Sequence, residues 1–271
     1  MSCIRARGLR KAFGSTIALD GVDLTVEAGR IVGLADCEGD LSVLDRDPRT
    51  QRGSLMHDVC FIADVAVLPR WMRVGQALDF MAGVHPRFDR VRAEGFLART
   101  TISHAGKVRD LSRGMVTQLH LALIMAVDVK LLVLDEPTLG LDILYRKQFY
   151  DSLLNDYFDG DRTILISTHD VAEVEHILTD VVFLDRGRVV LDSSMEDVEA
   201  RYLEVVVGPD RLAAARALRP LNERTLLGRS ILLFDGVARD QLAALGEVRA
   251  PGLADVFVAL MGGTRMAREA A

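Results

Sequence analysis

The stretch from Lys130 to Asp142 constrains the fold of this chain most, because it joins an apolar strand to two acids and a turn. Residues 131–134 form an uninterrupted aliphatic run, which is typical of a strand covered on both faces in a parallel sheet. Asp135 and Glu136 follow at the carboxyl end of that strand, which is the edge where open α/β sheets bind ligands. We therefore predict an α/β fold with a ligand site at these two acids.

Three motifs in a fixed order then resemble those of the ATP-binding cassette (ABC) ATPases, the motor subunits of ABC transporters. Residues 130–142, KLLVLDEPTLGLD, resemble the Walker B segment and the D-loop. Residues 111–115, LSRGM, resemble the signature loop, and residues 167–170, STHD, resemble the switch-histidine segment. The resemblance covers about residues 1–200 and implies the fold of a P-loop NTPase of the ABC type.

The resemblance also implies that the chain uses ATP and Mg²⁺, and it assigns a role to individual residues. Glu136 would orient the attacking water and His169 would sense the γ phosphate, whereas Asp135 and Asp64 would ligate the metal. The nucleotide itself would be contacted by the following residues: Phe13 on the adenine ring, and Ser112, Gly114 and Asp142 in the loops that meet a second subunit.

Plain structural interpretations stand beside three of these roles. Phe13 lies in a β-rich region, where a phenylalanine is more often part of the core than a stacking platform. Ser112 precedes an apolar helix and can cap it, although a helix amino terminus also favours phosphate. A lone histidine such as His169 is usually structural, but its place at a strand end favours the functional role.

The P-loop that the family requires has no counterpart in the sequence. That loop reads GxxxxGK followed by Ser or Thr, so that backbone N–H groups, a lysine and a hydroxyl hold the phosphates and Mg²⁺. Here the expected strand at residues 30–34 is followed by Ala35-Asp-Cys-Glu-Gly39, and the next strand begins at Asp40. The only Gly-Lys pair, at Gly106 and Lys107, lacks both the first glycine and the hydroxyl.

A deletion of roughly two dozen residues explains this gap, because a strand-helix unit spans about 30 residues. Asp36, Glu38 and Asp40 would place negative charge where phosphates bind, so we expect defective ATP binding at this chain's own half-site. The lost helix would also uncover part of the core. We therefore predict poor stability unless a partner or a rearranged loop covers the gap.

Periodicity and turn signals predict the remaining organisation. An antiparallel β subdomain occupies the amino-terminal part, and a helical subdomain spans about residues 70–127 of an ATPase-like domain at 1–202. Residues 203–271 are predicted to form a small α/β accessory domain with a disordered tail from Gly262. Four residues of the helical subdomain belong either to its core or to a groove for a membrane subunit, namely Trp71, Met72, Leu78 and Phe80.

Composition excludes several classes of protein. A net charge of −6 with a pI near 5.6 argues against non-specific nucleic-acid binding. No stretch reaches the ~18 apolar residues of a membrane helix, so we expect no direct insertion and a cytoplasmic chain attached to the inner face of the membrane through a partner. Cys3, Cys37 and Cys60 form no ligand pair and are read as reduced thiols.

The leading hypothesis is the ATP-binding subunit of an ABC transporter of the exporter type, with a polytopic membrane subunit and a second ABC ATPase subunit as partners. Its own turnover of ATP is left open because the P-loop is missing. Two alternatives remain: a pseudo-ATPase that donates its signature loop within a heterodimer, and an inactive deletion product. A soluble ABC protein of translation or DNA repair fits poorly, because the chain has one cassette and no basic patch.

Overall fold

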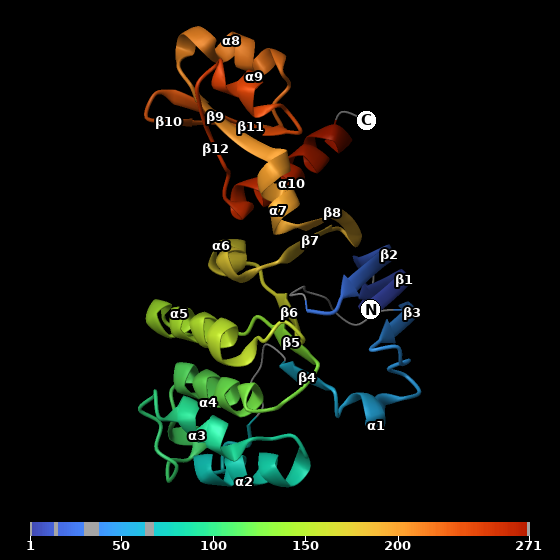
Figure 1. The fold of residues 1–271 in the computed structure, drawn as a ribbon, viewed down its shortest axis with the longest axis vertical. Helices are drawn as coiled ribbons and strands as arrows, with labels where there is room; N and C mark the ends of the chain where they lie inside the picture. Colours follow the sequence, from blue (N-terminus) through green and yellow to red (C-terminus); the bar gives the residue numbers. More distant parts are fainter. Residues whose placement is uncertain (1, 14–15, 30–37, 63–67, 270–271) are drawn as a thin grey trace. The chain divides into compact units, whose positions relative to one another are not determined.

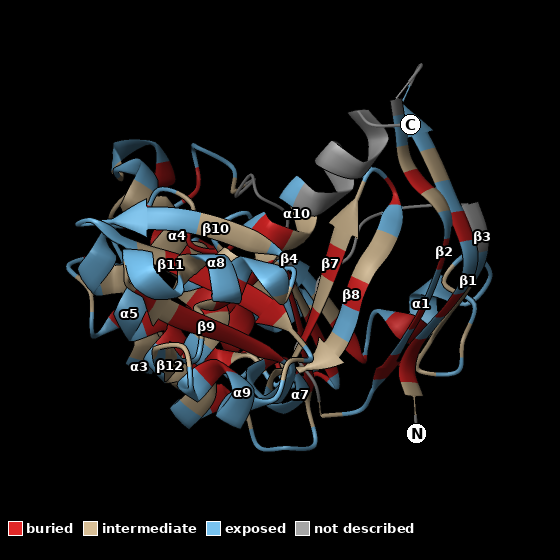
Figure 2. Cartoon of the chain, turned by 90° about the horizontal axis from the view of Figure 1, so that it is seen from above, coloured by how far each residue is buried: buried red, intermediate tan, exposed pale blue. Residues whose placement is uncertain are grey.

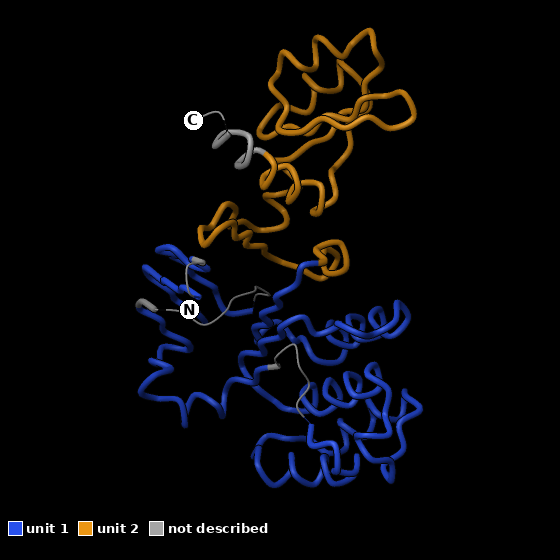
Figure 3. Tube along the Cα trace, turned by 180° about the vertical axis from the view of Figure 1, so that it is seen from behind, with its two compact units in different colours: residues 1–169 blue, residues 170–271 orange. Residues whose placement is uncertain are grey.

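The computed structural model describes residues 2–13, 16–29, 38–62 and 68–269 of the 271-residue chain (Figure 1). The chain forms two compact units, residues 1–169 and 170–271 (Figure 3). The boundary predicted at residue 202 lies inside the second unit, where residues on both sides of it share one apolar cluster that includes Phe183, Val198 and Val256.

The first unit contains, in chain order, β1 (Ser2–Phe13), β2 (Thr16–Glu27), β3 (Glu38–Val43), α1 (Arg52–Leu55), β4 (Val59–Ile62), α2 (Val74–Val84), α3 (Arg90–Leu97), η1 (Val108–Asp110), α4 (Arg113–Met125), β5 (Leu131–Asp135), α5 (Ile143–Ser152), η2 (Leu153–Tyr157) and β6 (Thr163–Ser167). The second unit contains α6 (Val171–Val174), η3 (Glu175–Ile177), β7 (Asp180–Asp185), β8 (Arg188–Ser194), α7 (Met195–Arg201), β9 (Tyr202–Val207), α8 (Pro209–Ala217), β10 (Asn222–Leu226), β11 (Arg229–Asp235), α9 (Arg239–Ala243), β12 (Glu247–Arg249) and α10 (Leu253–Glu269).

The predicted parallel sheet is confirmed. Within the described residues its strand order is β4-β5-β6, and both pairs of strands run parallel. Leu131, Leu132 and Leu134 of β5 are buried, as the aliphatic run requires for a strand covered on both faces. In Figure 1 the long helices α4 and α5 lie beside this sheet.

The amino-terminal strands form the predicted antiparallel sheet, whose order is β2-β1-β3 in the described part of the chain. Residues 16–27 form one continuous strand, β2. Gly21 inside this strand has a φ of 73°, which a glycine adopts without strain. The strand expected at residues 30–34 lies outside the described residues.

The predicted helical segment contains α2, α3 and α4, which pack around a shared apolar core. This core includes Val74, Leu78, Leu97, Leu119 and Leu123. The polar faces of α2 and α3 point to solvent, and Asp89 caps α3 by accepting a hydrogen bond from the Arg92 backbone N–H at 3.0 Å.

The end of the second unit follows a β-α-β-β-α-β order, with strands arranged β10-β11-β9-β12 among the described residues. Alternate residues of β9 face opposite sides: Leu203, Val205 and Val207 pack against α8 and α9, whereas Tyr202 packs in the cluster that includes α10. Figure 2 shows β9 as a buried strand. Helix α10 extends to Glu269, past the predicted end at Met261 and into the segment expected to be disordered.

Candidate functional site

The two acids predicted to bind a ligand lie at the carboxyl end of β5. Asp135 is the last residue of that strand, and Ser167, its register partner on β6, donates its hydroxyl to Asp135 Oδ1. Glu136 follows with a φ of 46°, and its backbone N–H donates to the Ser167 carbonyl at 3.0 Å. Left-handed backbone at a non-glycine residue is strained and persists where the surroundings hold it, as Ser167 does here.

Glu136 and His169, the two predicted catalytic residues, are in direct contact. The backbone N–H of His169 donates to Glu136 Oε1 at 2.8 Å, and the imidazole Nδ1 lies 2.6 Å from the same oxygen. Thr168 donates its hydroxyl to Glu136 Oε2 at 3.4 Å. The segment after β6 therefore holds both carboxylate oxygens, while the His169 side chain remains 75% exposed.

The predicted signature loop and D-loop pack against each other through glycines. A Cβ on Gly114 would lie 3.2 Å from the Gly140 carbonyl oxygen, and a Cβ on Gly140 would lie 3.2 to 3.4 Å from the Arg113 side chain. Gly140 also has a φ of 87°, which an L side chain rarely adopts. Arg113, a departure from the family's usual glycine, thus lies against the D-loop of its own chain.

Ser112 and Asp142 both cap helices. Ser112 Oγ accepts a hydrogen bond from the Met115 backbone N–H at 3.2 Å at the start of α4, and Asp142 Oδ1 accepts one from Tyr145 at 3.0 Å at the start of α5. The capping interpretation of Ser112 is therefore confirmed, and its contact with phosphate stays a prediction. Between these two caps lies a cavity of about 290 Å³ lined by Thr101, Ser112, Gly114, Met115, Gln118, Gly140, Leu141, Asp142 and Tyr145.

Phe13 is the last residue of β1 and is 65% exposed, so the core interpretation is wrong. The Lys11 ammonium lies 5.2 Å from the centre of its ring. An exposed aromatic ring can serve as a stacking platform, and this role stays a prediction. Asp64, the second predicted metal ligand, lies outside the described residues. Within the described ranges no three His, Cys, Asp or Glu side chains converge as a metal site would require.

All four lysines of the chain are described, and within the described residues none forms an ion pair with Asp135 or Glu136. Lys130 precedes β5 and so lies at the opposite end of the strand from Asp135, a separation of about 17 Å over five residues. Lys11 lies over the Phe13 ring, and Lys147 is on α5. Lys107 forms an isolated backbone β-bridge with Arg73 in the helical segment.

Of the four residues expected in a core or a groove, two are buried and two are exposed. Met72 and Leu78 are buried in the helical core, whereas Trp71 is 68% and Phe80 is 57% exposed. These two rings are thus available for contact with another protein. Over the described ranges no helix combines the length and the apolar character needed to cross a bilayer.

Sequence reasoning did not identify Ser167 as a partner of Asp135 or Arg113 as a partner of Gly140. Ser167 had a usable signal, because a hydroxyl at the end of the neighbouring parallel strand lies opposite Asp135 once the register is known. No sequence signal indicates the position of the Arg113 side chain, because that position depends on how two loops pack together.

No protein-family model matches the chain. The chain is 29% identical to the daunorubicin resistance ATP-binding protein DrrA3 of Streptomyces coeruleorubidus, covering 100% of this chain and 99% of that protein. It is 30% identical to the Nod factor export ATP-binding protein I of Cupriavidus metallidurans, covering 96% of this chain and 97% of that protein. A solved ATP-binding subunit of an ABC transporter has the same fold, with a TM-score of 0.64 at 20% identity over 73% of this chain and 92% of that chain.

Proposed function

This chain belongs to the family of ABC transporter ATP-binding proteins, and we propose that it acts as a subunit whose own nucleotide half-site is defective. Subunits of this family dimerise and pair with membrane transporter subunits. In our proposal the chain binds a polytopic membrane subunit on the inner face of the membrane. Its signature loop acts on a nucleotide that a second ATP-binding subunit holds.

One observation carries this proposal: the acids, the switch histidine and the loops that face a partner are assembled, but none of the four lysines forms an ion pair with Asp135 or Glu136 in the described part of the chain. Glu136 contacts His169, and Gly114 packs against Gly140. Lys130, the lysine nearest to Asp135 in sequence, lies at the far end of β5. The sequence therefore lacks the lysine and the glycine loop that hold the triphosphate in a P-loop.

Within the alignment the daunorubicin resistance protein is longer than this chain. The alignment with the daunorubicin resistance protein spans 314 residues although this chain has 271, so the relative carries at least 43 residues (314 − 271) that this chain lacks. The flanks of the expected P-loop position are both held in place. The Gly29 backbone N–H donates to Thr163 Oγ1 at 3.0 Å, and Glu38 pairs with Arg10 of β1. Eight residues, 30–37, connect these two anchored positions.

Ser112 and the first backbone N–H groups of α4, which we call the donor surface, offer hydrogen-bond donors to a phosphate. Ser112 keeps its hydroxyl hydrogen when its oxygen accepts from Met115, and the first N–H groups of α4 are free of intrahelical partners by geometry. A nucleotide bound by the partner would supply the γ phosphate to this surface. The chain's own residues would orient it by hydrogen bonds from Ser112 and from the backbone at Gly114.

Titration and turnover assays test the proposal. We expect the purified chain to show no micromolar binding of Mg-ATP, and to raise ATP turnover when mixed with an ATP-binding subunit of the same transporter that has an intact P-loop. Ser112→Ala should abolish this stimulation, because it removes the hydroxyl at the donor surface. Ser103→Ala is the matched control, because Ser103 is exposed in the same helical segment and lies outside the cavity.

Micromolar binding of Mg-ATP by the isolated chain would overturn the defective half-site. Failure of the chain to stimulate any intact subunit would instead favour the third hypothesis, an inactive deletion product.

A further inference from the structure

Residues 87–89, between α2 and α3, pair with residues 126–128, between α4 and β5, and we call these two short passages the junction. Phe88 and Val127 form an isolated antiparallel bridge. The Asp89 backbone N–H donates to the Ala126 carbonyl at 2.8 Å, and the Asp128 N–H donates to the Arg87 carbonyl at 3.0 Å. Residues 126–128 of the junction lie between the end of α4 and the start of β5, so they connect the helix that follows the signature loop to the strand that carries the acids.

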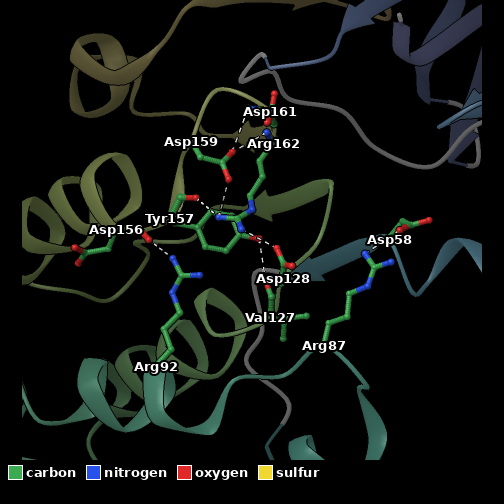
Figure 4. A network of polar contacts seen from close by, with 10 residues as sticks. All are labelled: Asp58, Arg87, Arg92, Val127, Asp128, Asp156, Tyr157, Asp159, Asp161 and Arg162. Carbon is green, nitrogen blue, oxygen red and sulfur yellow. Dashed lines mark hydrogen bonds and ion pairs between the residues drawn. The ribbon is translucent and has the colours of Figure 1, made fainter.

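Tyr157 is hydrogen-bonded to this junction. Its side chain is 1% exposed, and its hydroxyl donates to the Val127 carbonyl at 3.2 Å (Figure 4). Burial raises the pKa of this hydroxyl, so it stays protonated and remains a donor. Tyr157 ends η2, a π-helical turn that follows α5, and such turns are rare and often occur at functional sites.

Two arginines fix the Tyr157 ring relative to both sides of the junction (Figure 4). The Arg92 guanidinium, from α3, lies 5.3 Å from the ring centre and also donates to the Asp156 carbonyl. The Arg162 guanidinium, from the segment before β6, lies 4.9 Å from the ring centre and donates to Asp128 Oδ1 at 2.7 Å. Tyr157 is therefore bonded to the junction and flanked by a cation from the helical segment and one from the sheet.

The geometry of α4 turns a small change at the junction into a large one at the signature loop. Helix α4 has 13 residues and is about 20 Å long, with Ser112 capping one end and Val127 following the other. A tilt of about 10° at Val127 would move Ser112 by roughly 3.5 Å at that helix length. That displacement exceeds the length of a hydrogen bond, so it would remove Ser112 from a phosphate that it contacts.

We propose that Tyr157 is a positioning residue: its hydrogen bond to Val127 sets the tilt of α4 and thereby places Ser112 and Gly114 for action on a partner's nucleotide. This inference rests on the proposed function for its consequence, but the effect on the tilt belongs to the isolated chain and is measurable there. A phenylalanine would fill the same volume and keep both cations, so the hydroxyl is the part of the side chain that carries the role.

A distance measurement in the full-length chain tests the proposal. Nitroxide-bearing unnatural side chains replace Val84 of α2, which is 63% exposed, and Lys147 of α5, which is also exposed. Double electron–electron resonance then gives the distribution of distances between the two nitroxides. We expect one narrow distribution for the native sequence. In Tyr157→Phe the population of displaced distances should rise about fivefold, the change expected from one net hydrogen bond.

Tyr202→Phe is the matched control, because Tyr202 is also 1% exposed and also has an arginine over its ring, at 5.2 Å, but lies in the second unit. This variant should leave the distribution unchanged even where its urea midpoint falls. Arg162→Lys is a second variant that keeps the Tyr157 hydroxyl and a cation but loses the fork that joins Tyr157 to Asp128, and it should broaden the distribution less than Tyr157→Phe.

A folded Tyr157→Phe with the native distribution would overturn the proposal, as would equal broadening in Tyr202→Phe. If Tyr157→Phe fails to fold, the Arg162→Lys distribution decides, and a native distribution there counts against the role. The distances remain decisive if the native chain fails to stimulate an intact subunit, because that failure bears on the proposed function alone. Where stimulation occurs, it should fall in Tyr157→Phe and persist in Tyr202→Phe.

Discussion

Replacement of Asp58 by asparagine tests whether one buried carboxylate joins three parts of the first unit. Asp58 precedes β4, and its side chain is 7% exposed. Oδ2 accepts from Arg46, after β3, at 2.9 Å, and Oδ1 accepts from Arg87, in the junction, at 3.0 Å. The Lys130 ammonium lies 3.8 Å from Oδ1. Burial by itself would raise the pKa of Asp58, but the hydrogen bond from Arg46 and the charges of Lys130 and Arg87 lower it.

The expected loss follows from these contacts. A hydrogen bond to a charged group contributes about 1.5 to 3 kcal/mol, and Asp58 accepts two. Arg46 and Arg87 are 31% and 43% exposed, so water can solvate them after the change, and the lower end of that range applies. Asparagine also keeps one acceptor oxygen. Asp58→Asn should therefore lower the free energy of unfolding by about 2 kcal/mol, a large share of the ~5 to 15 kcal/mol of a typical domain.

Urea unfolding at several pH values measures this loss of stability and the direction in which it changes with pH. The folded-state pKa of Asp58 is lower than the ordinary value of 3.8, so the carboxylate stabilises the fold fully above that value and loses its effect as pH falls through the lower, folded pKa. The difference between native chain and Asp58→Asn should thus be constant from pH 7 to 5 and shrink below 3.8.

Asp79→Asn is the matched control, because Asp79 pairs with Arg90 but is 64% exposed, and its loss should be much smaller. An Asp58→Asn loss no larger than that of Asp79→Asn, or a difference that grows as the pH falls below 3.8, would refute the reasoning.

Two substitutions, one beside a glycine and one at a glycine, should change the free energy of unfolding in predictable directions. Leu227 is 96% exposed with a φ of 50°, and it precedes Gly228 in the two-residue turn between β10 and β11. Leu227→Asn should raise stability by about 1 kcal/mol in urea unfolding, because Asn-Gly suits a type I′ turn, whereas Leu226→Asn should give no gain. Gly140→Ala should lower stability by about 1 to 2 kcal/mol and reduce stimulation of a partner, because φ is 87° and Arg113 lies 3.2 Å from the new Cβ. Gly83→Ala, inside α2 with open space around it, should instead stabilise the chain.

Local sequence signals predicted the elements that have strong patterns. The strand predicted from the aliphatic run at residues 131–134 is confirmed as β5, because an uninterrupted apolar run is a strong local signal. Strand β10, NERTL, was missed because it is polar and half-exposed, so its pairing with β11 determines its structure more than its composition does.

The candidate site was predicted residue by residue, but not as a set of contacts. Each motif indicated its own position at a strand end or a helix start, which the structure confirms for Asp135 and Ser112. The contacts of Ser167 with Asp135 and of Tyr157 with Val127 join residues about 30 positions apart. Such contacts depend on strand register and on helix phase, and a pattern along the chain contains neither.

The loops that we propose to face a partner are held by contacts with each other and with their own helices. Gly114 meets Gly140 backbone to backbone, and Ser112 and Asp142 each cap the helix that they begin. The Glu136 carboxylate accepts hydrogen bonds from the Thr168 hydroxyl and from the His169 backbone N–H. In our proposal these contacts keep the geometry that a partner would use, although the chain's own half-site is defective. Ser112→Ala is informative because it removes a hydroxyl from the loop that would contact a partner's nucleotide.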